Sequence, residues 1–170
     1  MLDNRVSGLL NAQVNQEFYS AYLYLDFASY FTDKGLDGFA NWYQVQAQEE
    51  RDHAMLFYQY LHNNNFRVVL EAIAKPDQAL QAPMDPLKAG LAHEEYVTGL
   101  IHAIYAAAQE AKDFRTMQFL DWFIKEQGEE EKSAHDLITK MELFGGEAKG
   151  LYLLDSELAA RVYAPPTLVL

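Results

Sequence analysis

The chain has no cysteine among its 170 residues. This absence excludes structural disulfides, thiolate metal ligands and cysteine nucleophiles. No run of about 18 consecutive apolar residues occurs either, so we expect no membrane-spanning helix. The first ten residues, MLDNRVSGLL, lack the basic start and the long apolar run of a signal peptide. Together these absences predict a cytoplasmic protein with no membrane partner.

Basic residues are also scarce. The chain has 13 Lys and Arg against 25 Asp and Glu, which gives a formal net charge of -12. Nucleic-acid binding requires a basic patch, so a nucleic-acid partner is not expected. Such a charge attracts cations, although an acidic surface also serves simply to keep a protein in solution.

Proline is confined to five positions, and none of them interrupts the four long segments with helical periodicity. Pro86 stands at the start of the third segment, where proline is favoured. Half of the residues are hydrophobic, which is enough for the core of one domain spanning residues 1–170. Apolar residues recur about every 3.6 positions in each of these segments. They predict an all-α fold in which a four-helix bundle occupies residues 3–144, with helices over about 3–31, 36–63, 86–113 and 113–144.

The connections predict how these helices are arranged. Short corners at residues 32–35 and near Asp113 produce two antiparallel hairpins. The stretch 64–83 is different, because about 20 extended residues reach roughly 60 Å, whereas a helix of about 28 residues is only about 42 Å long. This stretch can therefore cross the whole bundle and place the second and third helices parallel.

Residues beyond Gly146 predict a short fifth helix over 155–163 with Asp155 as its N-cap. An apolar tail, residues 165–170, follows it. Two arrangements remain open for this region: packing against other subunits, or folding back onto its own bundle.

Six polar side chains interrupt the apolar stripes of the four long segments. A buried charge is costly unless it is paired or holds a metal. Counted from the corners, the residues of each hairpin fall at similar heights, so that all six lie in one layer of the core. The sequence therefore predicts a metal site inside the bundle, formed by Glu17, Glu50, His53, Glu94, Gln127 and Glu130.

The spacing of these residues suggests two unequal metal positions. Glu50 and His53 lie one turn apart on one helix face, whereas the counterpart pair on the last helix is Gln127 and Glu130. We expect one position to use Glu17, Glu50 and His53, and the other to use Glu50, Glu94 and Glu130, with Glu50 bridging. Gln127 is a poor ligand, and it is expected to hydrogen-bond water or dioxygen instead. The alternative is a metal-free hydrogen-bonded network, which the cost of unpaired carboxylates disfavours.

Two further features adjoin this layer. A run of carboxylates beside Glu130 is either a solvated helix face or a site for a third cation, and it consists of Glu49, Glu126, Glu129 and Glu131. Tyr24 lies two turns from Glu17 on the same stripe. It is equally well interpreted as a core residue or as an electron donor to a redox metal, whereas Trp122 is interpreted as core.

In these residues the chain resembles a bacterial non-haem ferritin over nearly its whole length. The resemblance implies a ferroxidase centre with one iron on Glu17, Glu50 and His53 and another on Glu94 and Glu130, beside Gln127 and Tyr24. It also implies a third iron on Glu49, Glu126, Glu129 and Glu130, and a hollow shell of 24 subunits. Bacterioferritin has a haem-ligand Met after its helix-B Glu, where this chain has Arg51. No haem is therefore expected.

The function implied by this resemblance is iron storage with ferroxidase activity. Fe(II) is oxidised by dioxygen or hydrogen peroxide, and Fe(III) oxide accumulates inside the cage. One alternative is a di-iron oxidase acting on a small organic substrate. Another is a cage with mainly assembly or metal-buffering roles. Three acidic residues near the corner at 113 are candidates for an iron channel, namely Glu110, Asp113 and Asp121.

Overall fold

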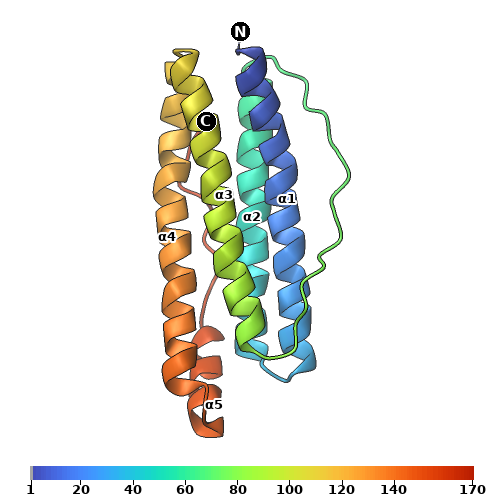
Figure 1. Ribbon diagram of the computed structural model, residues 1–170, viewed down its shortest axis with the longest axis vertical. Coiled ribbons are helices and arrows are strands. Elements are labelled where there is room, and N and C mark those ends of the chain that lie inside the picture. The colour runs from blue at the N-terminus through green and yellow to red at the C-terminus, as the bar shows by residue number, and fades with distance from the viewer. Residues whose placement is uncertain (1) are drawn as a thin grey trace.

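The computed structural model describes residues 2–170, and it contains five helices and no strand within them. Four long helices lie side by side, and a short fifth helix sits at one end of the bundle (Figure 1). This architecture confirms the predicted all-α bundle with a short C-terminal helix. The helices are α1 (Asn4–Asp33), α2 (Asp37–Asn63), α3 (Met84–Glu110), α4 (Phe114–Phe144) and α5 (Ala148–Leu158).

Two aspartates fix where α1 and α4 begin. Asp3 accepts hydrogen bonds from the backbone N–H groups of Arg5 and Val6 at the start of α1. Asp113 accepts one from the N–H of Thr116 at the start of α4. Each such cap satisfies otherwise unpaired backbone donors and contributes about 1 kcal/mol of stability. The α1–α2 corner is completed by Gly35, whose φ of 71° suits a residue without a side chain.

The long connection between α2 and α3 runs extended along the bundle from one end to the other, so that α2 and α3 are parallel, as predicted (Figure 1). Side chains of α1 hold this segment in place. The Asn11 amide donates to the Val69 carbonyl at 3.0 Å and accepts from the Val69 N–H at 2.8 Å. Asn15 also donates to the carbonyl of Glu71. These bonds replace the backbone partners that an irregular segment lacks.

The core consists of two apolar clusters separated along the bundle axis. The upper cluster includes Leu10, Phe57, Ile101 and Phe123. The lower cluster includes Phe27, Phe31, Phe39, Tyr43 and Leu137. In every long helix the predicted polar residues fall in sequence between the members of the two clusters. Because apolar packing is complete on both sides, the bundle can tolerate a polar layer in the middle.

The fifth helix differs from the prediction. It spans Ala148–Leu158 rather than 155–163, and Asp155 lies inside its last turn. The prediction that Asp155 caps its own helix was wrong, since its carboxylate accepts from the Phe39 N–H at 3.0 Å in the first turn of α2. α5 starts soon after the corner at Gly146 because Leu154 and Leu158 then face the lower cluster, where both are buried.

The tail after α5 folds back along its own bundle, which is one of the two arrangements left open by the sequence. It contacts α2 through Arg161 and Tyr163. It contacts α4 through Thr167, and Leu168 packs against the upper cluster. None of the helices in the described residues is long and apolar enough to cross a membrane. The cytoplasmic location stays a prediction.

Candidate metal centre

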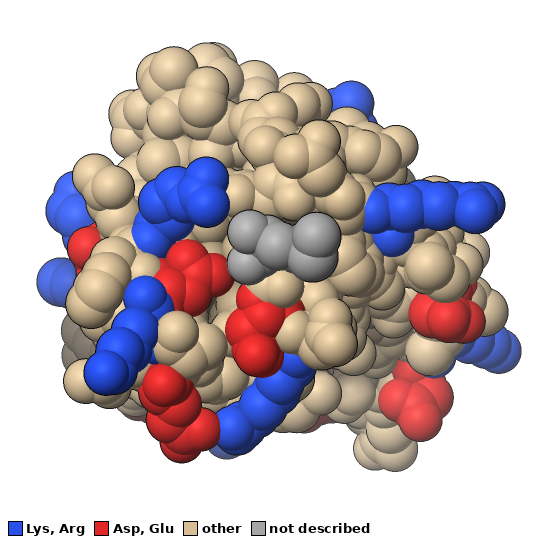
Figure 2. Space-filling view, turned by 90° about the horizontal axis from the view of Figure 1, so that it is seen from above, with Lys and Arg blue, Asp and Glu red and all other residues tan. Residues whose placement is uncertain are grey.

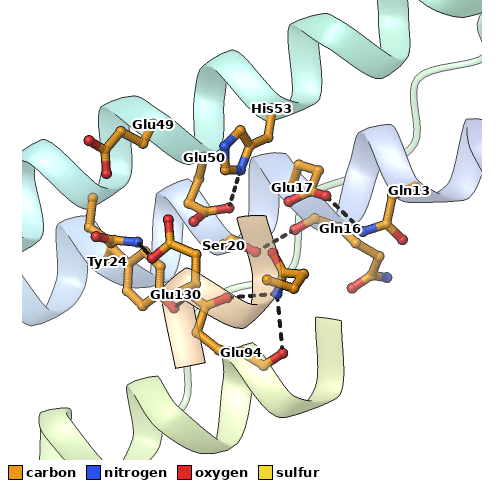
Figure 3. Close-up of polar contacts among 12 residues, drawn as sticks. Gln13, Gln16, Glu17, Ser20, Tyr24, Glu49, Glu50, His53, Glu94 and Glu130 are labelled. Atoms are coloured by element: carbon orange, nitrogen blue, oxygen red, sulfur yellow. Dashed lines mark hydrogen bonds and ion pairs between the residues drawn. The ribbon is translucent and has the colours of Figure 1, made fainter. Parts of the chain in front are cut away.

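The structure buries all six predicted residues, each exposing 8 % or less of its surface. One comes from α1, two from α2, one from α3 and two from α4. Figure 3 shows the Glu17, Glu50 and Glu130 carboxylates and the His53 ring directed into the space between the helices. Their shared height follows from the corner positions that the sequence predicts.

Glu17, Glu50 and His53 form the tightest group. One ligand atom from each lies within 4.8 Å of the others, and in the described residues no other such group of three or more is found. Glu50 Oε2 and His53 Nδ1 are 3.4 Å apart. Three of their buried atoms have no hydrogen-bond partner, namely Glu17 Oε2, Glu50 Oε1 and His53 Nδ1.

An unpaired buried polar atom costs about 1–3 kcal/mol. Here three such atoms belong to three neighbouring side chains that are potential metal ligands. A single bound cation would pair with all three. Carboxylate and imidazole donors suit iron and other divalent first-row metals. The donor set and its unpaired atoms therefore fit a metal ion better than a closed hydrogen-bonded network.

Glu94 is held on both of its oxygens. The Tyr24 hydroxyl donates to Oε1 across the core, and Gln127 Nε2 donates to Oε2 at 3.1 Å. Gln127 thus contacts a carboxylate of the layer directly. Its predicted bond to water or dioxygen stays a prediction. Tyr24 is a core residue by packing and also a direct partner of the polar layer. Electron donation by Tyr24 to a redox metal stays a prediction.

Glu130 has a partner that the sequence analysis did not assign. Gln46 Nε2 donates to Glu130 Oε2 at 2.5 Å. Gln13 supports Glu17 in the same way, with a bond of 2.8 Å. Both glutamines are buried. Gln46 lies on the apolar stripe of α2, so the signal that identified Glu50 also marked Gln46, but a neutral amide was not counted as a ligand.

Crowding and burial change the acidity of these carboxyls. Burial, assisted by the charge of Glu50, raises the pKa of Glu17 to about 8. Burial and the charge of Glu94 raise the pKa of Glu130 to about 8. The same two causes raise the pKa of Glu50 well above its usual range. Without a cation, the layer therefore retains protons near neutral pH, and a bound metal would displace them.

The residues predicted to form a third iron site are not brought together as closely as those of the polar layer. Glu49 is half-buried and pairs with Arg161 at 2.6 Å, and its carboxylate is turned away from Glu50 (Figure 3). Glu129 is exposed and pairs with Lys125 at 3.1 Å. Glu126 lies close enough to Glu49 for its charge to help raise the pKa of Glu49, after burial and against Arg161.

The three channel candidates each have a partner within the subunit. Glu110 pairs with Arg5 at 2.6 Å, Asp113 caps α4, and Asp121 accepts from Tyr105. At the end of the bundle where α1 begins, acidic and basic side chains are interspersed (Figure 2). Their role in a channel stays a prediction. Trp122 packs against the layer, with its ring centre 5.5 Å from that of His53.

Comparisons with known proteins show the family of this chain. The family model for the ferritin-like domain matches residues 8–144. The bacterial non-heme ferritin of Staphylococcus epidermidis is 36 % identical over 163 residues, covering 96 % of this chain and 98 % of that protein. The bacterial non-heme ferritin of Campylobacter jejuni is 35 % identical over 155 residues, covering 91 % and 93 %.

Solved structures show the same fold at higher identity. The open-pore ferritin from the archaeon Archaeoglobus fulgidus superposes with a TM-score of 0.93 at 41 % identity, covering 95 % of this chain and all of that one. A humanised archaeal ferritin gives a TM-score of 0.94 at 42 % identity, with 97 % and 100 % coverage. The chain therefore belongs to the ferritin family, as the resemblance to bacterial non-haem ferritins predicted.

Proposed function

We propose that this protein stores iron, oxidising Fe(II) in the polar layer and holding the Fe(III) oxide inside a cage of 24 copies. The observation that carries the proposal is the set of three unpaired buried atoms on Glu17, Glu50 and His53. Family membership and near full-length identity to non-haem ferritins support storage as the outcome.

Two iron positions divide the layer. Glu17, Glu50 and His53 bind the first Fe(II), and Glu94 and Glu130 bind the second with Glu50 between them. The charge of Glu94, which after burial helps to raise the pKa of Glu130, supports this second position. An oxygen-rich ligand set favours the higher charge of Fe(III), and dioxygen or hydrogen peroxide is the proposed oxidant. Tyr24 and Gln127 hold the Glu94 carboxylate in orientation while the charge of the bound iron changes.

We also propose a third iron position, outside the first two, on Glu49, Glu126, Glu129 and Glu130. Two of its members are salt-bridged in the metal-free structure. Iron binding there requires these bridges to open, so this position is expected to be weaker than the first two. A weak outer position is suited to passing iron onward to the mineral.

The cavity beside the layer argues against the alternative of an organic-substrate oxidase. It is lined by Tyr24, Tyr43, Gly90, Glu94 and Glu130, and its volume is about 20 Å³. This is room for about one water molecule. An organic substrate would need a pocket of roughly 300 Å³ or more, whereas Fe(II) and a diatomic or triatomic oxidant need no such space.

Aerobic Fe(II) oxidation by the assembled protein tests the assignment. Glu50→Ala and His53→Ala are expected to reduce the initial rate by roughly 100-fold, because each removes a ligand from the proposed centre. Glu95→Ala, the removal of an exposed carboxylate next to Glu94, is the matched control and should oxidise iron at the native rate. Native rates in both ligand variants would disprove the centre.

A further inference from the structure

The twelve residues after α5 are tied to the face of the bundle beside the metal centre, and we call residues 159–170 the strap. Several polar contacts fasten it, among them three besides those of the Arg161 side chain. The Asn41 amide donates to the Arg161 carbonyl at 3.0 Å. The Tyr163 hydroxyl donates to Asp52 at 2.5 Å, and the Trp122 indole donates to Thr167 at 3.1 Å.

Arg161 lies near the start of the strap, and its guanidinium is largely buried. Nη1 donates to Gln46 Oε1 at 2.7 Å, and Nη2 donates to Glu49 Oε2 at 2.6 Å. The guanidinium also stacks over the Trp42 ring, 4.0 Å from its centre. Four interactions, including one to the Trp42 carbonyl, fix this side chain far more firmly than an exposed ion pair would.

Gln46 connects this cation to the metal centre. Its Oε1 accepts from Arg161, so the amide orientation is set and its Nε2 faces Glu130, to which it donates at 2.5 Å. One hydrogen-bonded chain therefore runs from the strap through Gln46 to Glu130. Arg161 also holds Glu49 directly. Because a guanidinium does not lose its proton in proteins, this positive charge is permanent.

We propose that the strap is a metal-linked latch in which Arg161 occupies, as an internal cation, the side of the centre formed by Glu130 and Glu49. The inference rests on the proposed function, because it concerns metal binding at that centre. A second or third metal ion competes with Arg161 directly for Glu49. For Glu130 it competes with the Gln46 amide that Arg161 holds in orientation. A fixed positive charge also repels a cation beside it.

Competition for the carboxylates and repulsion by the guanidinium charge both lower the affinity for a metal ion. Arg161 weakens metal binding on the Glu130 side and leaves the Glu17 side largely unaffected. By linkage, a metal ion bound on the Glu130 side must in turn favour release of the strap. Arg161 is thus a positioning residue that keeps the outer positions weak, which allows oxidised iron to move on.

Calorimetric titration of the metal-free assembled protein with Zn²⁺ tests the latch, since Zn²⁺ has no redox chemistry. Arg161→Gln should leave the first binding event unchanged and tighten the later events roughly fivefold or more. Arg161→Lys keeps the charge and should restore nearly native affinities. Lys140→Gln removes a cation that pairs with Glu157 of α5 instead. It is the matched control and should bind as the native protein does.

Tryptophan fluorescence reports the strap itself, because the chain has two tryptophans and both touch it. Because Trp122 also packs against His53, the first binding event is expected to change the emission by itself. Zn²⁺ should then change the native emission a second time, in step with the later binding events. A chain ending at Ala160 should show no such change, and its later events should be as tight as those of Arg161→Gln. A strap with only a structural role would change thermal stability and leave metal affinity alone.

The metal centre and the latch are contradicted by different results. Absence of the first binding event in the native protein would overturn the metal centre, and the latch with it. A normal first event, with later events equally strong in the native protein and in Arg161→Gln, would overturn the latch alone.

Discussion

Glu50 Oε2 and His53 Nδ1 lie 3.4 Å apart on one face of α2, inside the core, yet His53 Nδ1 and the second Glu50 oxygen have no hydrogen-bond partner. A helical turn places the two side chains together. Packing alone would not retain such a pair, because each unpaired atom destabilises the metal-free fold. The arrangement is explained by a cation that binds there.

Glu50→Gln is expected to stabilise the metal-free protein while removing its ferroxidase activity. The change eliminates a buried carboxylate that lies among other carboxylates, and a Gln amide is able to donate to Glu17. We expect a gain of about 1–3 kcal/mol in the free energy of unfolding at pH 8, measured by denaturant unfolding. A loss of stability of similar size would show that the Glu50 charge is already compensated without metal.

Stability of the metal-free protein should fall as the pH rises from about 4.5 to about 8. Folding raises the pKa of Glu17 and Glu130 to about 8, so the folded state holds more protons than the unfolded state in this range. Stability therefore decreases with pH, and the contribution is fully present only below the unfolded pKa. Thermal midpoints recorded across this range test the slope, and Glu17→Gln should flatten it.

The same protons should be released when metal binds. Zn²⁺ affinity is expected to increase with pH up to about 8, with proton release detectable in buffers of different ionisation enthalpy. Binding that is independent of pH and buffer would mean that the carboxylates are already ionised in the metal-free protein.

Tyr24→Phe isolates the role of the Tyr24 hydroxyl. The ring still fills the lower cluster between Phe27 and Tyr43, but Glu94 loses one of its two hydrogen-bond donors. We expect a loss of about 1 kcal/mol in stability and a roughly tenfold slower oxidation of Fe(II). Tyr22→Phe, a change at an exposed tyrosine on the same helix, is the control. An unchanged rate in Tyr24→Phe would restrict Tyr24 to packing.

Gly38→Ala should detach α5 from the bundle. A Cβ at this position would lie 1.7 Å from the Asp155 carbonyl oxygen, so the helices must separate. We expect a loss of about 1–3 kcal/mol in stability. Gly8→Ala has open space around its Cβ, and it should instead gain about 0.5–1 kcal/mol. Equal effects of the two changes would mean that α5 does not pack closely on α2.

The sequence was sufficient for most of the fold because helical periodicity, corner residues and the length of the crossover are local signals. The same periodicity located Glu17, Glu50 and Glu94, since a charged group on an apolar stripe is conspicuous. Gln46 was marked by the same stripe but was not counted as a ligand because its amide is neutral, and Gln13 lies beside the stripe of the first helix rather than on it. Their roles depend on which way each side chain points.

The end of the chain could not be predicted because its contacts are distant in sequence. Asp155 looked like a cap for its own helix, whereas its partner, Phe39, lies on α2. Arg161 gave no signal, since its bonds to Gln46 and Glu49 depend on the fold bringing the tail back to α2. Contacts of this kind exist only after the bundle has formed.

The most direct test of the central claim is the number of iron atoms that each assembled particle retains. The metal-free protein is loaded aerobically with Fe(II), separated from free iron by size, and analysed for iron and protein. We predict a particle the size of a 24-subunit shell that retains far more iron than two or three atoms per subunit. A smaller particle, or one that retains only the iron its carboxylates bind, would contradict iron storage.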